Sequence, residues 1–342
     1  MVICALCRSP HAHAAHRDRR SVRAASGRLQ SPIPVSRTAS IPFDVNGRTV
    51  FITGAARGIG AAAAARLHAQ GANVALVGLE PERLEENAAS LGDRAAAFEA
   101  DVSELDALRR AVRGTVERFG AIDVAIANAG IAFTGSLASA PIEQVERTLA
   151  VNLLGVWRTD RAVIEQISER RGYLLNICSL AAVLHTPLMG AYTAAKAGVE
   201  ALTDALRVEI APSGARVGCA YFGFIDTDLV RAGRAQPSSQ ALAAGTPAIA
   251  RDPAPLATAI DAIERGIERR SARVWAPRWV GAMLLLRGIL QPLSERRMAR
   301  HSEPLVEAMR VAESTHEAHR QDPVLGVAAG ALAPSSPAAE GS

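Results

Sequence analysis

The sequence predicts a three-layer α/β/α fold around a doubly wound parallel sheet, in a single domain. Three observations lead to this prediction. Short apolar runs rich in β-branched residues alternate with longer helical stretches from residue 48 onward. The first run, 48–53, passes into a glycine-rich turn and then an alanine-rich helical stretch that reaches Gln70. Several later runs end on small or polar residues, and such strand ends meet at one edge of a parallel sheet.

Each predicted strand is followed by a helix, as in repeated β-α-β units. After 48–53, the predicted strands are 73–77, 94–100, 123–127, 173–178, 216–221 and 272–276. The predicted helices are 81–91, 105–119, 142–168, 191–210 and 257–269. This order is typical of the Rossmann type, which binds ligands at the carboxyl ends of its strands. The small and polar stretch 232–255 is predicted to be a mobile flap.

Composition favours one large domain with tails. The chain has 342 residues, of which 49% are hydrophobic, enough for a sizeable core. Residues 1–42 hold seven arginines against Asp18, so they carry six of the positive charges and leave the body at −2. A nearly neutral body predicts no nucleic-acid partner. The domains are therefore predicted as a disordered basic extension over 1–42, a catalytic domain over 43–290, and a helical extension with a disordered tail over 291–342.

The first 42 residues admit three interpretations: a start site upstream of the real one, a transit peptide, or a binding arm. Cys4 and Cys7, followed by three histidines, resemble metal-ligand spacing, but no second paired element accompanies them. We therefore predict no metal site. Two further cysteines, Cys178 and Cys219, do not make a disulfide framework in a chain of this length. The cysteine content therefore predicts a reducing compartment. We expect the cytoplasm, or an organelle if residues 1–42 are a transit peptide.

The glycine-rich turn predicts a phosphate-binding loop. Thr53-Gly54-Ala55-Ala56-Arg57-Gly58-Ile59-Gly60 stands between a strand and a helix. Glycine permits a tight turn and close backbone approach, and the helix N-terminus offers free N–H groups to a pyrophosphate. A glycine turn alone is a weak signal, because ordinary strand-helix turns also contain glycine.

A second signal comes from the only lysine in the chain. Of the 38 basic residues other than histidine, 37 are arginine and one is Lys196. A compact ammonium is not replaceable by a planar guanidinium where it must sit beside a phenol and a sugar. Tyr192 precedes it by four residues, so a helix places both on one face. This pairing predicts chemistry at Tyr192 and Lys196.

Together these motifs resemble the classical short-chain dehydrogenases/reductases, over roughly residues 44–290. The chain has the family's TGxxxGxG loop at 53–60, an Asp-Val pair at Asp101 and Val102, and an Asn-Ala-Gly element at 128–130. The resemblance implies a catalytic set of Asn152, Ser179, Tyr192 and Lys196. It also implies an NAD(P) site formed by Thr53, Gly54, Arg57, Gly58, Ile59, Gly60, Asp101, Val102, Asn128, Ala129, Gly130, Tyr192, Lys196, Gly223, Ile225 and Thr227.

Two positions depart from the family pattern. Phe222 stands where the family usually has proline after the sixth strand, which leaves the roof of the pocket open to doubt while Gly223, Ile225 and Thr227 remain. Gly78 stands where members that prefer NAD carry aspartate. Without that carboxylate nothing there repels a 2′-phosphate, and Arg57 could pair with one, so NADP is slightly favoured. Glu80 is close enough to reach a ribose, which keeps NAD as an alternative.

The resemblance implies reversible hydride transfer between NAD(P) and a carbonyl/alcohol pair. A free phenol has a pKa of about 10, so Tyr192 needs the positive charges of Lys196 and the oxidised nicotinamide to exchange a proton near neutral pH. Tyr192 is then general acid in reduction and general base in oxidation. Ser179 would orient the reacting oxygen, and Asn152 would hold a water that links Lys196 to solvent.

The substrate is predicted to be apolar. Predicted substrate contacts are Val183, His185, Met189, Phe222 and Phe224, and three further apolar residues, Phe133, Leu184 and Leu188, lie in the same segments. A hydrophobic ketone, lipid or steroid is favoured, with a 3-oxoacyl thioester as alternative. A non-catalytic NAD(P)-binding sensor or scaffold is the alternative of another class, and the complete catalytic set disfavours it.

Two interactions with larger partners are also expected. Small residues along the helix that carries Tyr192 (Ala195, Gly198, Ala201 and Ala205) would let a second subunit pack closely, which predicts a homodimer or homotetramer. The apolar stretch 279–290 is interrupted by Arg287 and is too short to span a bilayer. It could cap the pocket, touch a partner or make a peripheral membrane contact.

Overall fold

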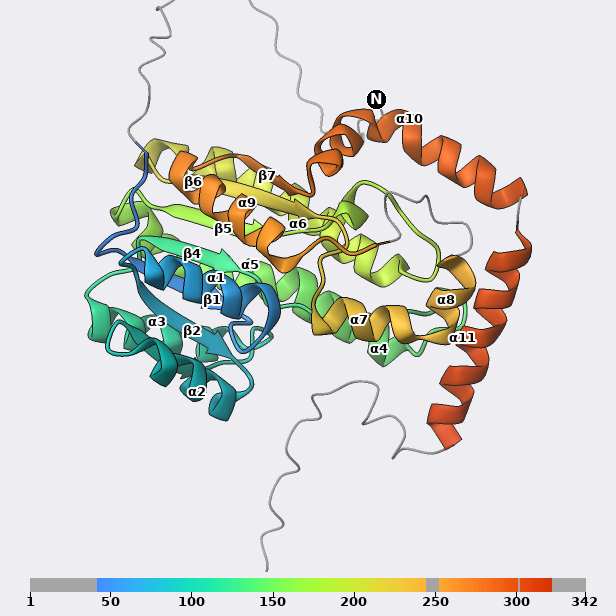
Figure 1. The fold of residues 1–342 in the computed structure, drawn as a ribbon, viewed down its shortest axis with the longest axis horizontal. Helices are drawn as coiled ribbons and strands as arrows, with labels where there is room; N and C mark the ends of the chain where they lie inside the picture. Colours follow the sequence, from blue (N-terminus) through green and yellow to red (C-terminus); the bar gives the residue numbers. More distant parts are fainter. Residues whose placement is uncertain (1–41, 244–251, 301, 322–342) are drawn as a thin grey trace, which may run out of the picture. The chain divides into compact units, whose positions relative to one another are not determined.

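A seven-stranded parallel sheet forms the centre of the molecule (Figure 1). The computed structural model describes residues 42–243, 252–300 and 302–321. The strand order is β3-β2-β1-β4-β5-β6-β7, so the chain reverses direction across the sheet between β1 and β4. The strands are β1 Thr49–Thr53, β2 Asn73–Gly78, β3 Ala95–Glu99, β4 Val124–Ala127, β5 Tyr173–Ile177, β6 Arg216–Phe222 and β7 Arg273–Ala276.

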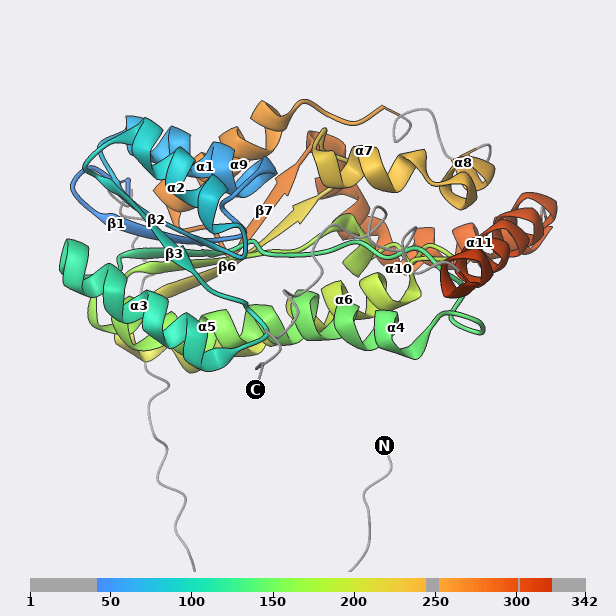
Figure 2. The same ribbon diagram turned by 90° about the horizontal axis from the view of Figure 1, so that it is seen from below.

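Helices cover both faces of this sheet (Figure 2). One face carries α1 Gly58–Ala69, α2 Pro81–Leu91 and α9 Leu256–Arg269. The other carries α3 Leu105–Phe119, α4 Ile142–Leu149, α5 Gly155–Glu169 and α6 Gly190–Glu209. Beyond the strand carboxyl ends lie α7 Asp228–Ala235, α8 Pro237–Ala243, α10 Arg278–Arg300 and α11 Glu303–Gln321. Three short turns complete the fold: η1 Ala150–Leu154, η2 Leu180–Ala182 and η3 Ala211–Ser213.

Alternation along each strand divides the core between the two faces. Val50 and Ile52 of β1 join the cluster under α1 and α9, whereas Phe51 joins the cluster under α3 and α5. Val50, Phe51 and Ile52 are all fully buried. Strands buried on both faces need continuous apolar sequence, which is what the short β-branched runs supply. The predicted three-layer fold is confirmed.

The structure differs from the sequence prediction in three segments. Part of the predicted flap over 232–255 is helical, because α7 and α8 extend to Ala243. The helix predicted over 142–168 is interrupted by the π-turn η1, which contains Asn152. In the C-terminal extension 291–342, which is predicted to end in a disordered tail, α11 continues to Gln321. Cys4 and Cys7 and the rest of the basic extension up to residue 41 lie outside the described residues.

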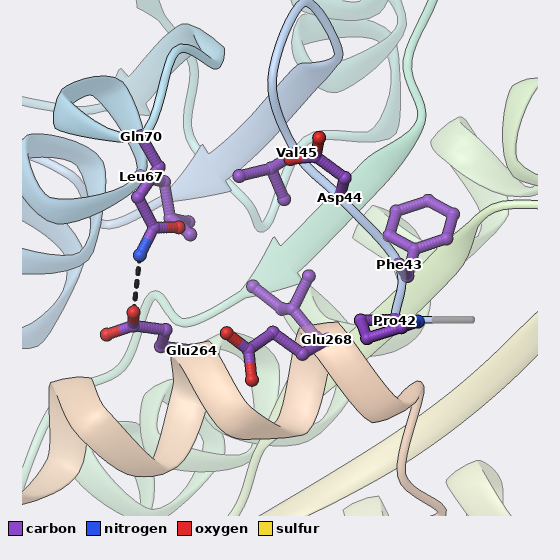
Figure 3. Close-up of a pocket in the computed structure, with 9 residues that line it drawn as sticks. Pro42, Phe43, Asp44, Val45, Leu67, Gln70, Glu264 and Glu268 are labelled. Atoms are coloured by element: carbon purple, nitrogen blue, oxygen red, sulfur yellow. Dashed lines mark hydrogen bonds between the residues drawn. The ribbon is translucent and has the colours of Figure 1, made fainter. Parts of the chain in front are cut away.

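A surface pocket lies at the edge of the sheet opposite the strand carboxyl ends. It is formed where the chain enters β1, between the C-terminal halves of α1 and α9 (Figure 3). Gln70 donates a hydrogen bond to Glu264 across it. None of the predicted site residues contributes to this pocket. Within the described residues, no helix combines the length and apolar character needed to cross a membrane.

The buried carboxyl group of Asp160 belongs to a hydrogen-bond network that joins β5, α5 and α6. Asn176 on β5 donates from Nδ2 to Asp160 Oδ2 on α5 at 2.9 Å and to Thr203 Oγ1 on α6 at 3.0 Å. Burial raises the pKa of Asp160 to about 8, from an ordinary value of 3.8, because desolvation disfavours the charged form. The native state therefore keeps a proton that the unfolded chain releases. The free energy of unfolding falls as the pH rises from 3.8 to about 8.

This linkage predicts a pH-dependent stability that Asp160→Asn removes. Between about pH 6 and about pH 9, we expect the unfolding free energy of the wild type to fall by about 3 kcal/mol more than that of the variant. The asparagine still accepts from Asn176 but has no proton to release. Denaturant unfolding at the two pH values measures the difference. Equal pH slopes in the two proteins would contradict the assignment.

Candidate active site

The glycine-rich turn brings backbone close to backbone at the N-terminus of α1. Gly54 adopts a φ of +65°, and a side chain there would meet the Cα atom of Ala129 at 2.8 Å. A side chain at Gly60 would collide with the carbonyl oxygen of Gly54. Among the described residues, no side chain caps α1, and its first turn contains no acidic residue. The first N–H groups of this helix are thus open to an anion.

Asn128 joins β1 to β4 where the strand order reverses. Its Nδ2 donates to the carbonyl oxygens of Thr53 at 3.0 Å and Gly54 at 3.2 Å. The Thr53 hydroxyl accepts from the backbone N–H groups of Asn128 and Ala129, at 3.0 and 3.2 Å. The glycine turn and the Asn-Ala-Gly element therefore form one unit. In open α/β sheets this reversal point is where ligands bind.

The loop after β6 closes on the same place. Thr227 caps α7 by accepting from Val230 N–H, and its methyl group would lie 3.7 Å from a Cβ atom at Gly58. Ile225 is buried, and Gly223 N–H donates to the Ala276 carbonyl at 2.9 Å. Two segments distant in sequence thus border the N-terminus of α1. After β3, the Asp101 carboxylate accepts from Ser103 N–H at 2.7 Å, and Val102 is buried.

A pair of opposite charges stands at the outer end of the turn. Arg57 makes a two-point contact with Glu80, through Nε and Nη2, and Arg83 Nη1 lies 3.9 Å from the same carboxylate. The three residues line a shallow surface depression together with Leu79, Glu82 and Glu86. Arg57 is therefore paired with Glu80, the residue that keeps NAD binding as an alternative in the sequence analysis.

Lys196 is buried although it carries a charge. Only 4% of the residue is exposed. Its Nζ donates to the Ile177 carbonyl at the end of β5 at 2.9 Å and lies 5.7 Å from the centre of the Tyr192 ring. The backbone carbonyl of Lys196 accepts from the Cys178 thiol at 3.2 Å. The lysine is thus held by β5 at both its backbone and its side chain, on the helical face that it shares with Tyr192.

The three tyrosines of the chain have different environments. The Tyr173 hydroxyl donates to the Ser271 carbonyl at 2.7 Å, and the Tyr221 hydroxyl donates to Glu200 at 2.8 Å. Burial raises the pKa of Tyr173 and of Tyr221, which keeps both phenols protonated. Tyr192 is the partly exposed tyrosine and the one beside Lys196.

Asn152 is fully buried and uses its amide group on a neighbouring loop. Its Oδ1 accepts from Ile131 N–H at 2.9 Å, and its Nδ2 donates to the Ile131 carbonyl at 2.8 Å. The π-turn η1 that contains it changes the hydrogen-bond register, as such turns do at functional sites. The side chain clamps the loop after Gly130.

Ser179 lies where β5 ends, beside the last residue of β6. Its Oγ accepts from Ala181 N–H at 3.1 Å and is 3.4 Å from the Phe222 carbonyl oxygen. The hydroxyl proton has this single long contact among the described residues. It can therefore turn toward another oxygen atom without losing a strong bond.

The predicted substrate contacts differ in their exposure. Val183 and Phe222 are buried, and their side chains belong to two different core clusters. His185 is exposed, Met189 is half-buried, and Phe224 is 38% exposed with the Arg234 guanidinium above its ring. The open part of the region is therefore formed by His185, Met189 and Phe224.

Sequence reasoning missed several residues that hold this site. Asn87 on α2 donates to the carbonyl oxygens of Ala55 and Ala56, at 3.3 and 3.0 Å, which fixes the glycine turn from below. Gln291 on α10 accepts from His185 N–H at 2.8 Å. Each is a polar residue on a helix. Only its tertiary contact distinguishes it from a polar residue that faces solvent.

The arrangement fits a dinucleotide with a reactive nicotinamide. The backbone cradle at Gly54 and Gly60 has no room for side chains, and open N–H groups at α1 suit a pyrophosphate. Lys196, Tyr192 and Ser179 lie at the carboxyl ends of the strands on the other side of the reversal point. This combination can position a hydride carrier next to a proton donor.

Comparison with known proteins agrees with this geometry. Residues 48–238 match the model of the short chain dehydrogenase family. The 2-(R)-hydroxypropyl-CoM dehydrogenase of Xanthobacter autotrophicus is 36% identical over 192 residues, 54% of this chain and 77% of that protein. The 3beta-hydroxysteroid dehydrogenase 1 of Eggerthella lenta is 33% identical over 204 residues, 58% and 78% respectively.

Solved structures show the same likeness. The crystal structure of a short-chain dehydrogenase/reductase, glucose/ribitol dehydrogenase, from Brucella melitensis is 29% identical with a TM-score of 0.61. It is matched over 97% of its length and over 68% of this chain. The chain belongs to the short-chain dehydrogenase/reductase family and is an NAD(P)-dependent oxidoreductase that acts on CH–OH and C=O groups.

Proposed function

We propose that this enzyme transfers a hydride reversibly between NAD(P) and the carbonyl or secondary alcohol group of an apolar substrate. The observation that supports this most is the contrast among the three tyrosines. Two are buried phenols committed to other partners, whereas Tyr192 is partly exposed and shares a helix face with the buried Lys196. A proton donor that must meet a substrate needs this combination of access and nearby positive charge.

Each residue then has a separate task. NAD(P), when bound, supplies or accepts the hydride. Tyr192 gives its phenolic proton to the substrate oxygen in reduction and takes it back in oxidation. Lys196 stabilises the phenolate through its charge and would donate to the ribose hydroxyls of the bound cofactor, while Ser179 orients the reacting oxygen through its hydroxyl proton. Asn152 holds the Ile131 loop in place at the nicotinamide side of the site.

An apolar substrate is favoured by the residues that remain accessible. Met189 and Phe224 offer accessible apolar surface, and Leu184 packs against the core cluster that contains Val183. The relative from Eggerthella lenta is named for a hydroxysteroid substrate, which is consistent with an apolar ketone or alcohol. A 3-oxoacyl thioester has no specific observation in its favour here.

A panel of ketones, steroids and acyl thioesters tests the proposal. We expect NADPH oxidation with apolar ketones, and a loss of turnover of about 1000-fold or more in Tyr192→Phe with cofactor affinity nearly unchanged. Tyr221→Phe is the matched control, because it removes an equal phenol hydroxyl that binds Glu200. Turnover of Tyr192→Phe at the wild-type rate would overturn the assignment. Binding of NADPH without turnover of any substrate class would favour a sensor or scaffold.

We further infer a slight preference for NADP over NAD. Two guanidinium groups, Arg57 and Arg83, border the depression at the outer end of the glycine turn, and Gly78 places no carboxylate at the end of β2. Both arginines can pair with a 2′-phosphate. Glu80 opposes this preference because it already engages Arg57 and would repel the phosphate. The balance between these groups sets the cofactor selectivity.

Glu80→Gln is expected to strengthen NADPH binding by about fivefold or more and to leave NADH binding within about twofold. The variant frees Arg57 and removes one negative charge from the depression. Glu86→Gln is the matched control, because Glu86 lines the same depression without an ion pair to Arg57 among the contacts described. Dissociation constants measured by fluorescence titration decide the question. A wild-type enzyme that binds NADH clearly more tightly would contradict the preference.

We also propose a homo-oligomer and a cytoplasmic location. Ala195 and Gly198 face the interior of their own chain, since a side chain at Gly198 would meet Leu153. The support for a subunit contact comes from Ala201 and Ala205, which are exposed on the same helix, and from exposed apolar residues on the outer helices, Trp157 at 45% and Val208 at 75%. The free buried thiols of Cys178 and Cys219 are consistent with a reducing compartment.

A further inference from the structure

One face of helix α10 packs against the protein, and no described residue covers the other face. On the inner face, Val280 is buried, and Trp279 and Leu284 pack against the core cluster that contains Cys219 and Tyr221 of β6. Arg287 donates to both oxygens of Glu200 on α6, at 2.9 and 3.0 Å. These contacts, with the one from His185 to Gln291, fix how the helix is rotated about its axis.

The outer face of α10 carries a line of exposed apolar residues, with arginine toward both ends of the helix. Leu285, Ile289 and Leu293 follow at intervals of four residues and are 85, 62 and 53% exposed. Arg278, Arg296 and Arg300 are exposed, and each stands seven residues from one of the three apolar residues, which is two helical turns and the same face. We call these six residues the α10 stripe.

We propose that the α10 stripe docks on the surface of a bilayer that contains anionic phospholipids. An amphipathic helix with exposed leucine and isoleucine on one face and arginine beside them lies in the interface, with its apolar side chains below the headgroups. Arg287 forms an ion pair with Glu200, whereas no ion pair to a described residue is found for the three arginines of the stripe. Anionic headgroups would supply their opposite charge. Glu295 is the only acidic residue of the helix, against five arginines. The proposal does not depend on the reaction proposed above.

A second copy of this chain fits the stripe less well. An antiparallel pair of α10 helices would bring Arg278 of one copy to Arg296 and Arg300 of the other. A parallel pair would align each arginine with itself. Like charges that meet across an interface disfavour association in both arrangements. A lipid surface offers the apolar layer and the opposite charge together.

Sedimentation of the full chain with lipid vesicles tests the proposal. We expect binding to vesicles of phosphatidylcholine mixed with phosphatidylglycerol, weakened by salt, and at least about tenfold weaker binding to phosphatidylcholine alone. Leu285→Ser/Ile289→Ser should lose binding by about tenfold or more on the same anionic vesicles. Ile142→Ser is the matched control, because Ile142 is 70% exposed but lies on α4. Arg296→Gln/Arg300→Gln should lose the preference for anionic lipid.

Three results would overturn the proposal. The wild type could fail to bind anionic vesicles. Binding could persist in Leu285→Ser/Ile289→Ser, which would place it elsewhere in the chain, as in the arginine-rich residues before residue 42. Light scattering could instead show that this variant converts an oligomer to a monomer while vesicle binding is unaffected, which would assign the stripe to a second copy. Unchanged circular dichroism and NADPH affinity establish that the variants are folded.

Discussion

The hydrogen bond from Lys196 Nζ to the Ile177 carbonyl is the interaction on which the arrangement of the site depends. A buried ammonium is costly unless acceptors surround it, and here the acceptor is a main-chain carbonyl at the end of a central strand. The Cys178 thiol binds the Lys196 carbonyl and so ties the same two segments together a second time. α6 is thereby fixed against β5, which sets the position of Tyr192 one turn earlier and of Ser179 two residues beyond the strand.

On the other side of the reversal in strand order, the protein relies on backbone rather than side chains. Gly54 and Gly60 let the turn approach Ala129 so closely that no side chain fits. Asn128 and Asn87 then hold the turn by its carbonyl oxygens, which leaves the N–H groups of α1 free for an anion. A charged side chain enters only at the outer end, where Arg57 and Glu80 are paired. We therefore propose that binding of the dinucleotide and selection between NAD and NADP rest on separate parts of the protein.

The sequence predicts the strands well, because apolar runs and the glycine turn between strand and helix leave local signals. It does not predict features that depend on tertiary packing. Asp160 reads as an exposed helical acid, yet it is buried beside Asn176. Val183 and Phe222, two of the predicted substrate contacts, are buried in different core clusters, and the sequence carries no signal of that burial. The π-turn at Asn152 and the contact of Gln291 with the substrate loop have no periodic pattern to indicate them.

The central claim is that an ammonium at position 196, and not merely a positive charge, supports proton exchange at Tyr192. Turnover of Lys196→Arg with an accepted ketone and NADPH tests this most directly, because arginine keeps the charge but its planar group cannot occupy a site built for one compact donor. The account predicts a folded protein whose kcat falls by about 100-fold or more. A Lys196→Arg enzyme whose kcat stays within about threefold of the wild type would contradict the account.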